Sequence, residues 1–363
     1  MRFKASIRNI STFTKFTASL ATLGHIAWVR LDEEFARFTV IPEQGSQVWS
    51  VLSIDTIFEK DEYTIQSAAE NNTINLEVPL APLQRALKSA QHGQATSASI
   101  RLTKKDNIPL LSLTITTQAT TGSAPTGSNG YPGNGELDGT GFGATESFPQ
   151  QSEEFFGRFT EREVTITQDV PVRVLAPASV EGLHEPRCRD PEVHLTLPNL
   201  MQLKGISDRF TKLAMPGKAT TRTGFNSAAS GPKLELSANA HGCLKLALNT
   251  DAMRISSLWT GLENPELDPS QVADGEEGLA NHPSTRMKNL GDASGQSDEG
   301  WATVRIEGRD WGRVLSVGRL GGRVIACFCH EHALVLYVFL TDPETGGDAE
   351  GSVLAYYTSS YAT

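Results

Sequence analysis

Long apolar runs are missing from this 363-residue sequence: no stretch approaches the ~20 apolar residues that a membrane-spanning helix needs. The first residues, MRFKASIRNIS, lack the apolar stretch of a signal peptide, so we expect an intracellular protein. Only four cysteines are present, which excludes a disulfide framework in a chain of this length. Positive charge is in deficit, with 32 Lys and Arg against 42 Asp and Glu. The net charge of -10 argues against a protein whose whole surface coats nucleic acid, but not against a local basic lining.

Three segments lack apolar periodicity. Residues 119–163 are rich in Gly, Ser, Thr and Pro, residues 262–299 are acidic and rich in turn formers, and residues 214–232 form a smaller segment of the same kind. None contains enough apolar side chains to offset the entropy cost of ordering. We therefore predict three mobile insertions.

The rest of the chain divides into two similar halves, each reading strand, helix, strands, helix, strands. Stretches such as SIRLT and LSLTI alternate with the period of half-buried antiparallel strands. Apolar residues at helical spacing predict four short helices, at residues 10–23, 80–92, 199–213 and 308–318. A duplicated α+β unit is the simplest interpretation, with domains at residues 1–175 and 192–363. Residues 176–191, rich in proline and without periodicity, would connect them.

Each predicted helix carries cations away from its apolar side. A single helix of this kind is usually an ordinary solvated face. Four of them in a chain with ten more acids than bases favour a binding surface instead. The candidate residues are Lys15, Arg85, Lys88, His92, Lys204, Arg209, Lys212, Arg309 and Arg313.

One stretch, CFCHEH, could suggest a metal site through Cys327, Cys329, His330 and His332. On a strand the cysteines face one way and the histidines the other, so four ligands would not converge. Core cysteines beside a hairpin turn are the preferred interpretation. Serine, histidine and acidic residues elsewhere form no recognisable nucleophile motif. We therefore expect no metal, no cofactor and no enzymatic activity, and keep a metal-dependent enzyme as a remote alternative.

Several stretches together resemble a known family. They are AENNTINLEVPLAPLQRALKSAQ, IRLTKKDNIPLLSLTI, TQDVPVRVLAP and EPRCRDPEVHLTLPNLMQLKGISDRF, and the start MRFKASI fits as well. The sequence is similar to the Hus-one subunit of the heterotrimeric nine-one-one checkpoint clamp, a relative of the proliferating-cell nuclear clamp. The similarity covers both halves and fails over the three insertions.

The resemblance implies a sliding-clamp fold, with two helices of each domain lining a central hole and antiparallel sheets behind them. The cations named above would then face double-stranded DNA without reading its sequence. The implied partners are two paralogous subunits of the Rad-nine and Rad-one type, a clamp loader, and checkpoint and repair proteins in the nucleus. Client peptides would bind beneath residues 176–192.

The resemblance also implies that two strands pair with neighbouring subunits. They contain Val164, Ile166, Val172 and Val174 in the first half, and Met253 and Ile255 in the second. A homotrimeric replication clamp that tethers a polymerase is the alternative within the same fold.

Overall fold

A computed structural model describes residues 1–92, 95–121, 160–214, 231–267, 275–292, 295, 297–341 and 346–362. The predicted insertions at 119–163 and 214–232 lie largely outside the described residues, as does part of 262–299. None of the helices in the described part of the chain has the length and apolar character that crossing a bilayer requires.

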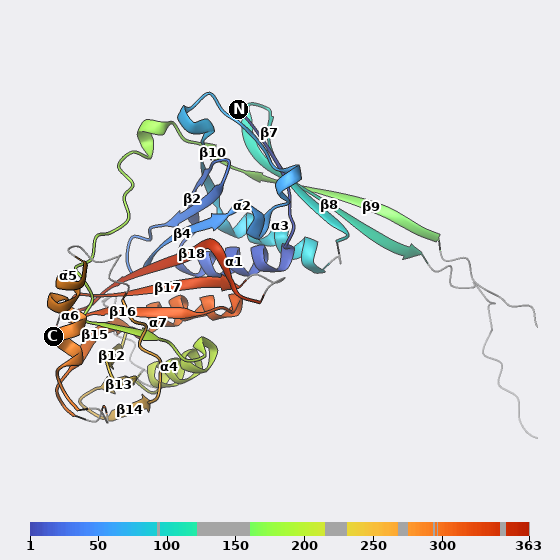
Figure 1. The fold of residues 1–363 in the computed structure, drawn as a ribbon. Helices are drawn as coiled ribbons and strands as arrows, with labels where there is room; N and C mark the ends of the chain where they lie inside the picture. Colours follow the sequence, from blue (N-terminus) through green and yellow to red (C-terminus); the bar gives the residue numbers. More distant parts are fainter. Residues whose placement is uncertain are drawn as a thin grey trace, which may run out of the picture.

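Four helices form one layer of the molecule. They are α1 (Ile10–Leu23), α3 (Leu80–His92), α4 (Leu200–Ala214) and α7 (Gly308–Val314), the last continued by the 3-10 helix η5 (Leu315–Leu320). Helix α1 contacts α3 on one side and α7 with η5 on the other, and α4 packs against α7. The order across the layer is therefore α3, α1, α7, α4 (Figure 1).

The first helix shows how the sequence fixes these elements. The Asn9 side chain accepts a hydrogen bond from the Thr12 amide at 2.9 Å and so caps the helix. Phe13, Phe16 and Leu20 are buried on one face, where Phe16 and Phe38 meet edge to face at 5.0 Å between ring centroids. The chain leaves the helix at Gly24, whose amide bonds back to the Leu20 carbonyl.

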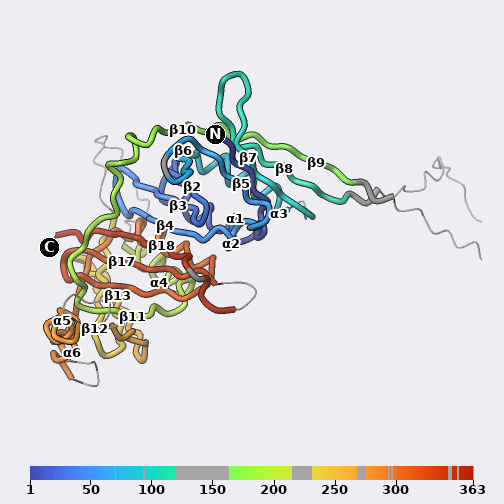
Figure 2. Tube along the Cα trace, turned by 45° about the horizontal axis from the view of Figure 1, so that its top comes forward, coloured from blue at the N-terminus to red at the C-terminus, as the bar shows by residue number. Residues whose placement is uncertain are grey.

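The strands form three antiparallel sheets. The five-stranded sheet has the order β5 (Thr64–Gln66), β1 (Arg2–Ser6), β7 (Ser97–Lys105), β8 (Ile108–Thr121), β9 (Thr160–Pro171). The four-stranded sheet has the order β14 (Arg254–Trp259), β13 (Leu244–Asn249), β12 (Lys233–Asn239), β15 (Trp301–Glu307). The nine-stranded sheet has the order β10 (Arg173–Val174), β6 (Ile74–Pro79), β2 (Ile26–Leu31), β3 (Phe35–Val40), β4 (Gln47–Ser53), β18 (Asp348–Ser359), β17 (Ala333–Thr341), β16 (Val324–Cys329), β11 (Val193–Thr196). Figure 2 shows β8 and β9 extending together as a ribbon away from the rest of the chain.

The sheets repeat between the two halves. The order β6-β2-β3-β4 of the first half recurs as β15-β12-β13-β14, and β1-β7-β8-β9 recurs as β11-β16-β17-β18. Strands β4 and β18 join the halves, with Val48 opposite Tyr356, and both side chains are fully buried. The corresponding strands β14 and β9 are each the last strand of a sheet within the described residues.

Polar side chains also connect the halves. Ser46 Oγ donates to the Asp310 carboxylate at 2.7 Å and lies 2.6 Å from Thr358 Oγ1. All three residues are buried. Because a buried carboxylate is costly without a donor, this group of residues fixes α7 against the β3–β4 turn.

The second insertion is more ordered than predicted. Residues 262–299 contain two short helices, α5 (Gly275–Asn281) and α6 (Pro283–Lys288), and α6 packs against β11. His282 caps α6 by accepting from the Ser284 amide, and Met287 contacts the core. Part of the segment predicted to be mobile therefore packs against the core, because a few apolar side chains suffice when a sheet already supplies the other surface.

Candidate nucleic-acid interface

The predicted cations lie on the helix layer. Eight of the nine are exposed: Lys15, Arg85, Lys88, His92, Arg209, Lys212, Arg309 and Arg313. None of these eight side chains forms an ion pair with an Asp or Glu of the described residues. The charges of the seven lysine and arginine side chains among them are therefore available to an external anion.

Helix α3 has the clearest division between an apolar and a basic side. Leu80, Leu83 and Leu87 are buried, whereas Arg85 and Lys88 point away from the core. Neither α3 nor its neighbour α1 contains an acidic residue. The positive potential on this part of the layer is thus not neutralised locally.

Lys204 does not share this arrangement. Its Nζ lies 2.8 Å from the Gly312 carbonyl of α7 and 3.3 Å from the Asp208 carboxylate, and only 22% of the side chain is exposed. Lys204 therefore connects α4 to α7, and we expect it to contribute less to phosphate binding than the exposed cations. The acid four residues ahead on the same helix interrupts the basic stripe in the sequence and pairs with Lys204 in the structure.

The predicted fourth helix is also shorter than residues 308–318. Its α-helical part ends at Val314, and the 3-10 helix η5 follows. The glycines permit close contact between helices: a Cβ at Gly308 would lie 2.3 Å from Thr211 Oγ1, and one at Gly318 2.7 Å from Leu200 Cβ. Packing against α4 thus explains glycines that weaken the helix itself.

The residues predicted at subunit contacts separate into two groups. Val164 and Ile166 on β9 are 40% and 39% exposed, and Ile255 lies half-buried on β14. Val172 is 7% exposed and Val174 pairs with Leu76 of β6, so both are packed within their own chain. Met253 lies in the turn before β14, where its amide bonds to Thr250.

The connecting segment crosses the nine-stranded sheet on the face away from the helices. Tyr357 Oη donates to Glu185 at 2.7 Å, and Cys329 Sγ lies 3.4 Å from the Arg189 carbonyl. Burial, with the hydrogen bond to Glu185, raises the pKa of Tyr357. Beneath this segment is a groove of about 540 Å³, lined by Trp28, Trp49, Leu183, Tyr337 and Tyr357 among others.

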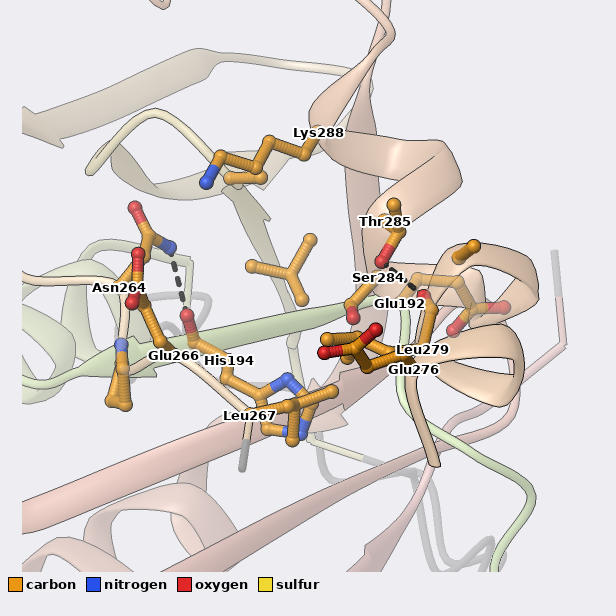
Figure 3. Close-up of a pocket in the computed structure, with 14 residues that line it drawn as sticks. Glu192, His194, Asn264, Glu266, Leu267, Glu276, Leu279, Ser284, Thr285 and Lys288 are labelled. Atoms are coloured by element: carbon orange, nitrogen blue, oxygen red, sulfur yellow. Dashed lines mark hydrogen bonds between the residues drawn. The ribbon is translucent and has the colours of Figure 1, made fainter. Parts of the chain in front are cut away.

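A second cavity, of about 480 Å³, lies between β11 and the helices α5 and α6 (Figure 3). His194 lies at one side of it, with its carbonyl bonded to the Asn264 amide at 2.7 Å. Burial, and then the neighbouring His282 ring, lowers the pKa of His194 to about 4. Sequence reasoning missed this cavity because it depends on helices inside a segment predicted to be mobile.

The cysteines and histidines of CFCHEH are separated as expected for a strand and turn. Cys327 and Cys329 are buried in β16, and burial raises the pKa of each thiol to about 12. His330 Nδ1 accepts a hydrogen bond from the Thr303 amide at 3.0 Å. Across the described residues, no group of three His, Cys, Asp or Glu side chains has an arrangement that could hold a metal ion.

Comparisons with known proteins agree with this geometry. The family described as Hus1-like protein matches residues 1–362. The chain is 35% identical over 362 residues to "Checkpoint protein hus1" of Schizosaccharomyces pombe, covering 99% of both chains. It is 23% identical over 274 residues to "Checkpoint protein HUS1" of Homo sapiens, covering 74% of this chain and 76% of the human protein.

The fold has its own counterpart among solved structures. The crystal structure of Proliferating Cellular Nuclear Antigen from Entamoeba histolytica superimposes with a TM-score of 0.56, at 11% identity and over 99% of each chain. The predicted α+β sliding-clamp fold and the resemblance seen in the sequence are both confirmed. The chain belongs to the Hus1-like family.

Proposed function

We propose that this chain is one subunit of a heterotrimeric ring that encircles double-stranded DNA at damage sites in the nucleus. The ring would be placed on DNA by a clamp loader and would serve as a platform for checkpoint and repair proteins. Membership of the Hus1-like family and relatives named as checkpoint proteins support the checkpoint role. The sliding-clamp fold supports the ring.

The ring proposal rests on one repeated feature. Strands β4 and β18 pair inside the chain, and their equivalents β14 and β9 each lie at the edge of a sheet within the described residues. Helices α3 and α7 begin at equivalent points of the two halves, so the halves can be aligned there. Following the paired residues from strand to strand then makes Ser50 of β4 equivalent to Ser257 of β14. The same counting from α1 and α4 makes Leu354 of β18 equivalent to Ile166 of β9. Ser50 and Leu354 are opposite each other where the halves join. A second join of the same kind would place β9 against a β14-like strand of the next subunit.

Burial supports the same conclusion. Leu354 is fully buried at the internal join, whereas its equivalent Ile166 is 39% exposed. Val48 is likewise fully buried, and its equivalent is the half-buried Ile255. Exposed apolar side chains on an unpaired strand edge are unfavourable in an isolated chain. Pairing with neighbouring subunits would cover them by the contact that the chain already uses internally.

The helix layer would face the duplex. Its exposed cations come from short helices without side chains arranged to read base edges, so binding would be electrostatic and independent of sequence. The acidic balance elsewhere would keep DNA from the other surfaces. Client peptides would occupy the aromatic groove beneath residues 176–192, on the opposite face.

A homotrimeric replication clamp is the second candidate, and one observation favours it. In the equivalent register, Arg254 of β14 would lie opposite Asp169 of β9 from another copy, so opposite charges would meet. Measuring the mass of the purified chain by light scattering separates the candidates. We expect a defined one-to-one-to-one complex only after co-expression with two paralogous subunits; a homotrimer of the pure chain, or a stable monomer that never pairs, would reject the proposal.

A further inference from the structure

The five-stranded sheet carries an unexpected group of cations on its outer face. Arg2 and Lys4 of β1 and Arg101 and Lys105 of β7 are all exposed. The residues between them, Phe3, Ala5 and Ile100, are buried against the helices. Since side chains alternate along a strand, the cations point away from the helix layer. We call these four residues the outer basic patch.

The outer basic patch has no acidic neighbour across the strands. Lys4 lies directly opposite Arg101, and like charges in this position destabilise a sheet. Every other cross-strand neighbour is uncharged: Gln66 and Thr64 on β5, and Ser112 and Ile108 on β8. None of the four cations forms an ion pair with any residue that the structure describes. Asp169 on β9 is the first acid across the sheet, one strand beyond Ser112.

The second half of the chain shows what normally covers this face. By the same counting of registers, Lys4 corresponds to His194 and Arg101 to Cys327. His194 faces α6, with its ring 6.3 Å from that of His282, and Cys327 is buried near the connecting segment. The positions equivalent to Lys4 and Arg101 are thus covered by the chain itself in the second half, whereas the four cations of the first half are exposed. The exposed positions carry Lys and Arg, and their covered equivalents are His194 and Cys327.

We propose that the outer basic patch docks an acidic segment of a partner protein, rich in phosphoserine, aspartate or glutamate. Charge complementarity carries the assignment: the patch is a cationic area on a chain of net charge -10, so it attracts anions that the remaining surface repels. The lysine and arginine side chains, with the exposed Thr64 and the half-buried Thr103 beside them, supply the charge-assisted donors that phosphate oxygens and carboxylates accept.

Nucleic acid fits this face less well. A duplex on the helix layer lies on the opposite side of the sheet and cannot reach it. The outward positions of β1, β5, β7 and β8 hold no aromatic side chain on which unpaired bases could stack. Four cations in one small area match one or two anionic groups, whereas duplex-binding proteins commonly contact about six to ten phosphates.

The test compares two single charge reversals in the assembly in which the full-length chain purifies. Lys4→Glu removes a cation from the patch and faces Arg101, so it creates an ion pair and keeps the sheet stable. Arg85→Glu changes the net charge equally but lies on α3. The probes are a fluorescein-labelled peptide of alternating phosphoserine and glutamate, the same peptide with serine and glutamine, and a labelled DNA duplex, all followed by fluorescence anisotropy.

We expect Lys4→Glu to weaken binding of the phosphoserine–glutamate peptide about tenfold and to leave duplex affinity unchanged. Arg85→Glu should weaken duplex binding and leave peptide affinity unchanged. The serine–glutamine peptide should not bind the wild-type assembly or either variant. Equal loss of peptide binding in both variants would show general charge attraction and overturn the proposal. So would loss of duplex affinity in Lys4→Glu, which would assign the patch to nucleic acid. Failure of the wild-type assembly to bind the peptide below about 1 mM would also reject it.

Discussion

Lys204 of α4 and Gly312 of α7 are joined by a hydrogen bond of 2.8 Å from the lysine Nζ to the glycine carbonyl. The contact lies between two of the helices that form the basic layer, and Asp208 holds the same ammonium group at 3.3 Å. A charged donor on a helix carbonyl is a strong tertiary contact, because the carbonyl near a helix end otherwise lacks a full set of partners. Among the nine predicted cations, this one serves the fold.

The first prediction follows from that contact. Lys204→Gln should lower the free energy of unfolding by about 1–2 kcal/mol, since it removes a partly buried charged hydrogen bond. It should leave the salt dependence of DNA binding unchanged. Lys212→Gln changes an exposed residue on the same helix, and it should leave the free energy of unfolding unchanged and reduce the salt dependence of DNA binding. Urea titrations and salt-dependent anisotropy measure the two effects; a fall in the salt slope for Lys204→Gln would place that lysine at the DNA.

Glycine substitutions test the close packing of α7 on α4. Gly308→Ala should destabilise the protein by about 1–3 kcal/mol, because the new Cβ would lie 2.3 Å from Thr211 Oγ1. Gly205→Ala is the matched control, since Gly205 lies inside α4 with no neighbouring atom within 4 Å of its would-be Cβ. That change should stabilise the protein by about 0.5–1 kcal/mol through helix propensity. Thermal unfolding distinguishes them, and a similar effect at both positions would contradict the packing argument.

The local elements could be read from the sequence far better than their contacts. The bounds of α1 and α3 agree with residues 10–23 and 80–92 because each has one strong apolar stripe and a clear start, such as the Asn9 cap. The fourth helix was extended too far, since its glycines serve α4 and not the helix itself. Local pattern carries no information about such a partner.

Long-range pairing was the part that sequence could not supply. Strands β4 and β18 meet although about 300 residues separate them, and the alternating pattern of β4 recurs in β2, β3 and β15, so it does not identify the partner. For the same reason, the sequence could not show that Val172 and Val174, which we predicted at a subunit contact, also pack within their own chain. Only the register showed that Ile166 and Ile255 hold the positions that Leu354 and Val48 hold inside the chain.

Assembly should depend on the free edge of β9. Ile166→Asp should weaken association with the neighbouring subunit by about tenfold or more, because a charge would enter a position whose internal equivalent is fully buried. Ile108→Asp replaces another exposed apolar residue of the same sheet, 54% exposed, outside the expected pairing segment. Co-purification yield and sedimentation velocity measure the effect. If both variants assembled as well as the wild type, β9 would not be part of the interface.

The basic layer predicts a simple response to salt. Charge reversal of Arg85 and Lys88 should weaken binding uniformly for duplexes of different sequence. The slope of log affinity against log salt should fall by about 0.9 for each phosphate that the variant no longer neutralises. Circular dichroism of the variant checks that α3 is intact. An unchanged slope in the assembled ring would identify the stripe as an ordinary solvated face.

Stability below neutral pH should depend on His194. Burial and the neighbouring His282 hold its pKa at about 4 in the folded chain, below the ordinary value of 6.5. The unfolded chain therefore binds more protons between these two pH values, so the contribution is complete above about pH 6.5 and is lost as the pH falls toward 4. Its size is at most about 3 kcal/mol, reduced by water in the adjoining cavity. Replacing His194 with Gln should flatten the fall in unfolding free energy across this range, whereas Gln at the exposed His332 should not. Parallel curves for the two variants in urea titrations from pH 4 to pH 7 would mean that the His194 imidazole is solvated in the folded protein.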